Sequence, residues 1–122
     1  MNWQGEIVDF LGRSIDVFLR YYVSGILEKV ELVTYIERGE VEVKLTVGGR
    51  EQKIDYDAFK CADDEDERDK QRECYFENES LWMEYFIALE NNFTAIEKSM
   101  GEVSEVLAER YHVDVVSKVK TE

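Results

Sequence analysis

The sequence has no proline, one histidine and only two cysteines among its 122 residues. Cys61 and Cys74 form no CxxC pair, so we expect free thiols and no disulfide framework. With His112 alone, no histidine-based metal site or general base is expected, and we predict no cofactor. Apolar runs are short and interrupted by charge, so no membrane-spanning helix is expected. The first residues lack the basic and apolar regions of a signal peptide, and we therefore expect a cytoplasmic protein.

Basic residues are also scarce relative to acidic ones. Asp and Glu number 28 against 15 Lys and Arg, which gives a net charge of -13. A charge of this sign opposes contact with bare nucleic acid or an anionic membrane, and it favours a basic protein surface as partner. Hydrophobic residues make up 44% of the chain and aromatic residues 12%, which is enough to build a core. We therefore expect residues 1–122 to form a single acidic domain.

Apolar residues repeat with helical spacing near the N-terminus and then alternate. Steps of three and four residues predict a helix from about Trp3 to about Val30, with Ser24-Gly25 as its end or a bend. Alternation then predicts strands over residues 32–36, 41–47 and 53–57, with short turns between them. Three neighbouring strands joined in this way form an antiparallel meander.

The second half begins with a run of charged residues. Residues 63–73 contain no apolar side chain, and residues 60–78 are expected to form an exposed acidic loop or a solvated helical turn. From Ser80, a favourable N-cap, helical spacing continues to Tyr111, and Gly101 is where this helix can break in two. The tail at 112–116 adds a short strand or frays. The predicted fold class is α+β, in the order α-β-β-β-α, with a further helix if Gly101 is a break.

Two resemblances bear on function. Residues 101–106 (GEVSEV) resemble the metal-binding helix of all-α nucleotide pyrophosphohydrolases of the MazG type. That family has a carboxylate where this chain has Ser99, its second acidic helix has no room before Glu122, and the strands contradict an all-α fold. The order α-β-β-β-α is similar to that of double-stranded-RNA-binding domains. Those domains hold phosphates with lysines at the start of the second helix, whereas residues 77–84 are acidic here, so no direct contact with nucleic acid is expected.

The apolar segment 81–89 is the strongest candidate for a contact surface. Eight of its nine residues are apolar, so a helix here is apolar on every side. Either the helix is enclosed between the sheet and the other helix, or one face meets a partner or a second copy. In the second case Trp82, Tyr85 and Phe86 form the centre of the contact. The rim that steers a basic partner then consists of the acidic residues directly before it, namely Asp63, Asp64, Glu65, Asp66, Glu67 and Asp69.

The function predicted from these features is binding without catalysis. We expect a small acidic inhibitor or adaptor that covers a basic, nucleic-acid-binding surface of another protein, with the solvent face of the sheet adding carboxylates. Immunity proteins, anti-defence proteins and DNA mimics are similar in size, acidity and fold class. One alternative is a homodimer that resembles secretion chaperones and escorts a client protein. The other is a small metal-dependent hydrolase that uses carboxylates, since hard cations prefer oxygen ligands.

Overall fold

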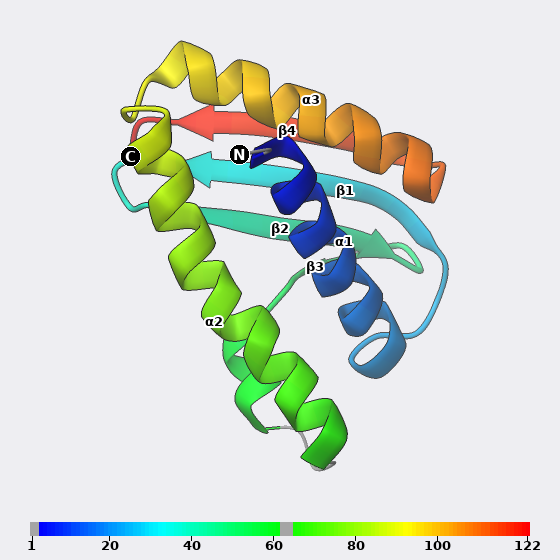
Figure 1. Ribbon diagram of the computed structural model, residues 1–122. Helices are drawn as coiled ribbons and strands as arrows, with labels where there is room; N and C mark the ends of the chain where they lie inside the picture. Colours follow the sequence, from blue (N-terminus) through cyan, green and yellow to red (C-terminus); the bar gives the residue numbers. More distant parts are fainter. Residues whose placement is uncertain (1–2, 62–64) are drawn as a thin grey trace.

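The fold has two layers, a four-stranded sheet and three α-helices that lie together on one of its faces (Figure 1). The computed structural model describes residues 3–61 and 65–122, and it describes side chains except those of residues 60–68. The elements in chain order are α1 (Trp3–Tyr21), β1 (Leu27–Tyr35), β2 (Glu40–Val47), β3 (Arg50–Lys53), the 3-10 helix η1 (Tyr56–Cys61), α2 (Glu65–Ala88), α3 (Phe93–Tyr111) and β4 (Asp114–Lys120).

The sheet is mixed, with the strand order β3-β2-β1-β4. β1 and β3 both pair with β2 in antiparallel fashion, which confirms a meander, although β3 covers only four residues. β4 pairs in parallel with β1, from Lys29 opposite Asp114 to Tyr35 opposite Lys120. The C-terminal segment is therefore a full edge strand, which decides between the expected short strand and a frayed tail and adds a fourth strand to the predicted meander of three.

Alternation along β2 separates the two faces of the sheet, as its sequence predicts. Val41, Val43, Leu45 and Val47 are buried toward the helices, whereas the residues between them are exposed or half-buried on the opposite face. The helices contribute the rest of the core, chiefly through Ile7, Phe10, Leu11, Ile15, Trp82, Tyr85, Ile96, Met100, Val103 and Leu107. The α+β fold class is thus confirmed, with one sheet face packed on helices.

The N-terminal helix is shorter than predicted, and the third strand is displaced. α1 ends at Tyr21 and β1 begins at Leu27, so the helix does not reach Val30. Val30 lies on the helix-facing side of β1 and is fully buried there. The chain turns at Gly25, which has positive φ, before it enters this strand. β3 ends at Lys53, and after Ile54 docks in the core the chain turns into η1 instead of continuing as a strand.

The second half of the chain also differs from its prediction. Residues 60–78 were expected to form an exposed acidic loop or a solvated helical turn, and from Glu65 onward they belong to α2, which runs without interruption through Ser80. The helices separate after Ala88, where Glu90 and Asn91 have positive φ, and not at Gly101. Asn92 caps α3 by accepting a hydrogen bond from the Ala95 amide at 3.0 Å. This capping hydrogen bond marks the start of a new helix, although the spacing of apolar residues along the sequence shows no break here.

Candidate functional site

The predicted acidic rim lies around the start of α2. Asp63 and Asp64 are outside the described residues. Glu65, Asp66 and Glu67 belong to the first turns of α2, but their side chains are outside the described part of the chain. Asp69 is exposed on the same helix. The role of these six residues as a partner-binding rim therefore stays a prediction.

The predicted centre of the contact surface is buried instead. Trp82, Tyr85 and Phe86 are only 1%, 0% and 3% exposed, and the Trp82 ring packs edge-on against Phe10 of α1. Burial raises the pKa of the Tyr85 hydroxyl. Placing these three residues on a partner-facing surface was wrong, because their side of α2 is the one that fills the core. The enclosed alternative describes them correctly.

Three other large apolar side chains lie exposed along α2. Phe76 is 63% exposed, Met83 59% and Ile87 69%. They follow one another at steps of seven and four residues, which places them in one line along a helix of 3.6 residues per turn. We call them the outer stripe of α2. Large apolar side chains that share one exposed helix face are typical of a contact surface.

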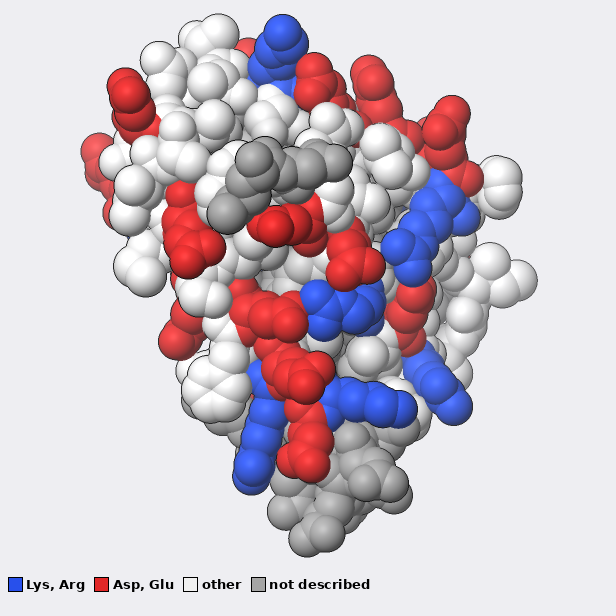
Figure 2. Space-filling view, in the orientation of Figure 1, with Lys and Arg blue, Asp and Glu red and all other residues white. Residues whose placement is uncertain are grey.

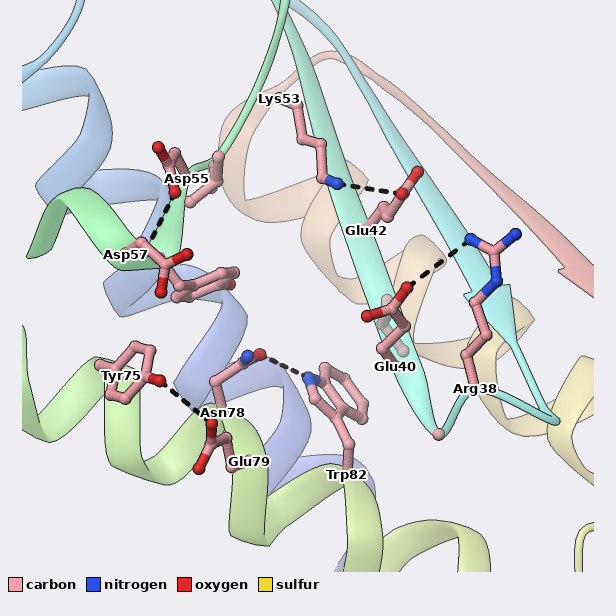
Figure 3. A pocket seen from close by; sticks show the side chains of 14 residues that line it. Arg38, Glu40, Glu42, Lys53, Asp55, Asp57, Tyr75, Asn78, Glu79 and Trp82 are labelled. Atoms are coloured by element: carbon pink, nitrogen blue, oxygen red, sulfur yellow. Dashed lines mark hydrogen bonds and ion pairs between the residues drawn. The ribbon is translucent and has the colours of Figure 1, made fainter.

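A groove of about 650 Å³ borders one side of the outer stripe. It lies between α2, the first residues of β2 and the segment that leads from β3 into η1 (Figure 3). Carboxylates prevail among its charged residues, which are Glu40, Glu42, Asp55, Asp57 and Glu79 against Arg38 and Lys53. At its wall, the buried Trp82 ring donates its indole N–H to Asn78 Oδ1 at 2.7 Å. We call this the sheet-side groove.

Both cations of the sheet-side groove are already paired within the chain. Lys53 donates to Glu42 Oε1 at 3.0 Å, and Arg38 lies 3.7 Å from Glu40 Oε1. Burial tends to raise the pKa of the Glu42 carboxyl, but its hydrogen bonds and the charge of Lys53 outweigh burial, so this pKa lies below its ordinary value. Glu79 accepts a hydrogen bond from the Tyr75 hydroxyl at 3.1 Å. The ion pairs within the described part of the chain do not include Glu79, which leaves its charge available.

The sheet-side groove also exposes part of a strand edge. Ile54 donates its amide to the Val43 carbonyl at 2.9 Å, and the chain then leaves the sheet. Because backbone groups of a strand alternate in direction, the N–H and C=O of Val41 point to the same edge as those of Val43. No strand of the described chain lies opposite Val41, so these groups face the groove.

A second acidic groove, of about 260 Å³, borders the other side of the outer stripe. It lies between α1 and α2, and its charged residues are Glu6, Asp9, Glu77 and Glu84 against Arg13. Arg13 pairs with Glu77 and, at 3.4 Å, with Asp9. Glu6 and Glu84 take part in none of the ion pairs formed by the described residues. We call this the helix-side groove, and with the sheet-side groove it places carboxylates along both flanks of the stripe.

The open face of the sheet, in contrast, carries no excess of acid. Five lysines lie on it (Lys29, Lys44, Lys53, Lys118 and Lys120), and so do five acids (Glu31, Glu40, Glu42, Glu51 and Asp114). Several are paired across strands, such as Lys118 with Glu31 at 3.2 Å. Figure 2 shows the helix-bearing face, where acidic side chains prevail over basic ones. The acidic surface is therefore that of the helices, and the solvent face of the sheet adds little to it.

Of the remaining reactive residues, Cys74 and His112 are described, whereas the Cys61 side chain lies outside the described part of the chain. Cys74 is a buried free thiol, and burial raises its pKa, which disfavours the reactive thiolate. His112 is exposed and ends α3 in a left-handed conformation. Among the described side chains, no three His, Cys, Asp or Glu residues are placed to hold a metal ion together. None of the described helices is long and apolar enough to cross a membrane.

Comparisons of the chain with protein-family models, curated proteins and solved structures gave no match. The site must therefore be interpreted from its own geometry. Its distinguishing feature is the outer stripe between two acidic grooves.

Sequence reasoning missed Phe76, Met83 and Ile87 as the exposed apolar residues. Their spacing is present in the sequence, but Phe76 precedes Ser80, where the helix was expected to begin. Extending the helix backward through the charged run would have joined Phe76 to Met83 and Ile87. Which side of α2 faces the core follows from its packing on α1 and η1, which the local pattern does not specify.

Proposed function

We propose that this protein binds a basic surface of another protein through α2 and covers that surface, acting as an inhibitor or adaptor without catalysis. The observation that carries the proposal is the outer stripe, with three side chains 59–69% exposed between two grooves rich in carboxylates. An apolar centre with a charged rim is the usual anatomy of a protein interface.

The charge of the grooves indicates the chemistry of the partner. The two grooves hold nine carboxylates and three cations, and each cation is paired with a carboxylate of its own groove. A partner with an apolar patch surrounded by Lys and Arg complements this arrangement. Such a surface also binds phosphate backbones, so its occlusion would exclude nucleic acid from the partner.

The net charge supports fast association with such a partner. At -13 the chain attracts basic surfaces from a distance, and the balanced sheet face directs this attraction to the helix side. Electrostatic attraction acts mainly on the association rate, whereas the apolar stripe governs how long the complex persists.

Selection from a random peptide library tests the proposal even though the partner is unidentified. The library is selected on the wild-type chain and counter-selected on a Phe76→Ser, Met83→Ser, Ile87→Ser variant, whose exposed positions should tolerate the change. We expect the selected peptides to combine Lys or Arg with large apolar residues. Acidic or neutral consensus sequences, or equal binding to the stripe variant, would contradict the proposed surface.

A matched pair of charge variants separates the site from net charge. Glu79→Lys with Glu84→Lys reverses one carboxylate in each groove, and Glu102→Lys with Glu109→Lys makes the same change in net charge on exposed positions of α3. With a selected peptide, the groove pair should lower the association rate more than tenfold at low salt, and the α3 pair much less. Equal losses would show that only overall charge matters.

Single truncations then test the stripe. If Met83 is a central contact, Met83→Ser should raise the dissociation rate roughly 30-fold. This factor corresponds to a loss of about 2 kcal/mol of binding free energy. Val106→Ser, at a residue on α3 that is 38% exposed, is the control and should leave the dissociation rate unchanged.

A further inference from the structure

A second surface, separate from the outer stripe, lies at the β4 edge of the sheet, opposite the β3 edge that borders the sheet-side groove. β4 is an edge strand of seven residues, and its only strand partner among the described elements is β1. It contains no proline and no bulge that would prevent a further strand from pairing with it. Lys118 and Lys120 do not block this edge, because Lys118 pairs with Glu31 and Lys120 lies over the Tyr35 ring.

The register of β4 on β1 determines which of its backbone groups are available. Ile36 donates its amide to the Lys120 carbonyl at 3.0 Å, so the backbone groups of Lys120 face β1. Because directions alternate along a strand, the N–H and C=O of Val115, Ser117 and Val119 point outward. These three residues are the hydrogen-bonding positions that a new strand would use.

We propose that two copies of this chain pair through β4 in antiparallel fashion, with Ser117 on the two-fold axis, and so form a continuous eight-stranded sheet. In this register Val115 lies opposite Val119 of the second copy on the helix-facing side, and Asp114 lies opposite Lys120 on the open side. Each pairing occurs twice, because the strands are related by symmetry.

Charge complementarity favours a second copy as the occupant. Opposite charges face each other at both ends of the paired strands, through Asp114 and Lys120. β4 carries two lysines and one aspartate, so this edge lacks the acidic excess that gives the chain its net charge of -13. Two copies therefore meet less repulsion at this edge than at the acidic helices.

The helix-facing side of this edge supports the same pairing. The Ser117 hydroxyl is buried and has no hydrogen-bond partner among the described residues. Because the chain's own atoms enclose this hydroxyl, the side chain must change rotamer to reach the edge, where the hydroxyl of the second Ser117 supplies a donor and an acceptor. A groove of about 550 Å³ runs beside the strand, where small residues of α3, Gly101, Ser104 and Ala108, leave room for Val119 of the second copy.

Disulfide trapping tests the register directly. In a Cys61→Ser, Cys74→Ala background, Ser117→Cys should form a disulfide-linked dimer within minutes under mild oxidation, since paired positions lie within disulfide range. Val119→Cys alone should not, because its symmetry mate lies four residues away along the partner strand. A mixture of Val115→Cys and Val119→Cys chains should form the heterodimer. Equal trapping of Ser117→Cys and Val119→Cys, or none in either, would overturn the proposal.

A charge swap tests the interface without cysteines. Size-exclusion chromatography with light scattering, with the wild type loaded at about 100 µM, should give twice the mass of the monomer. Asp114→Lys should weaken the dimer at least tenfold by placing lysines opposite Lys120, and adding Lys120→Asp should restore it. Circular dichroism checks that each variant is folded. A wild type that stays monomeric, or a double variant that dimerises as weakly as Asp114→Lys alone, would exclude this interface, and neither result affects the proposed role of α2.

Discussion

At the scale of single residues, a buried hydroxyl in β1 makes the fold less stable than it can be. Thr34 is fully buried on the helix-facing side of the sheet, and its Oγ1 has no hydrogen-bond partner in the described part of the chain. Thr34→Val keeps the shape and removes the unsatisfied group, so we expect the free energy of unfolding to rise by about 1 kcal/mol. Urea unfolding followed by circular dichroism measures this. A loss of stability would mean that the hydroxyl is hydrogen-bonded in solution.

A second residue links stability to pH. Burial raises the pKa of Glu42, but Lys53 and Tyr35 together lower it by more. The pKa therefore lies below the ordinary value of about 4.3. A carboxyl with a lowered pKa stabilises the fold above its unfolded-state pKa, and that contribution disappears as the pH falls through the folded-state pKa. Glu42→Gln should therefore cost about 0.5–1 kcal/mol at pH 7, as for a partly exposed ion pair, and little at pH 3. Equal costs at both values would show that the Lys53 pair contributes nothing.

At the scale of elements, the boundary between α2 and α3 gives a paired prediction. Asn92→Ala removes the side chain that caps α3 and should cost about 1 kcal/mol, whereas Asn92→Ser keeps a cap and should cost less. Gly101→Ala should stabilise the same helix by about 0.5–1 kcal/mol, because Gly101 is helical and an added Cβ meets nothing within 4 Å. Thermal melts compare the three variants. Destabilisation by Gly101→Ala would mean that the helix breaks at Gly101 after all.

The elements that sequence reasoning predicted correctly are those with a clear local period. β2 alternates strictly, and its valines face the core as expected. Residues 27–30 were assigned to the helix because Leu27 and Val30 keep its three-residue spacing, and only pairing with β2 and β4 selects the strand. Residues 60–78 were expected to form an exposed loop or a solvated helical turn because a charged run has no apolar face of its own. α2 nevertheless begins at Glu65, and Gln71 and Cys74 are buried on it, which the charge pattern does not reveal.

The candidate site could be predicted only as a region of the chain. Net charge and the apolar segment at 81–89 led to the hypothesis of a basic partner that contacts this helix, and the basic partner stays a prediction. The residues differ because α2 is apolar on two sides, and the larger side chains, Trp82 and Tyr85, occupy the core. A local pattern cannot decide which apolar side is enclosed when both are apolar. The parallel pairing of β4 joins residues far apart in the sequence and likewise leaves no local signal.

At the scale of the whole molecule, charge is unevenly distributed and should limit stability. The sheet face is balanced, so the excess of acid that gives -13 lies on the helices and the connecting segments. Such an excess destabilises the compact state through repulsion, which salt screens within about 10 Å at 0.1 M. Salt also weakens the surface ion pairs, but exposed pairs contribute little each.

We therefore expect the melting temperature at pH 7 to rise by several degrees between about 10 mM and 500 mM sodium chloride, since about 1 kcal/mol shifts the midpoint of a domain of this size by a few degrees. The control is Glu102→Lys with Glu109→Lys, which lowers the net charge from -13 to -9 because each change adds two positive units. This variant should melt higher than the wild type at low salt and gain less from added salt. A melting temperature that falls with salt would show that local pairs, such as Lys53 with Glu42 and Arg110 with Asp16, outweigh the repulsion between the helices.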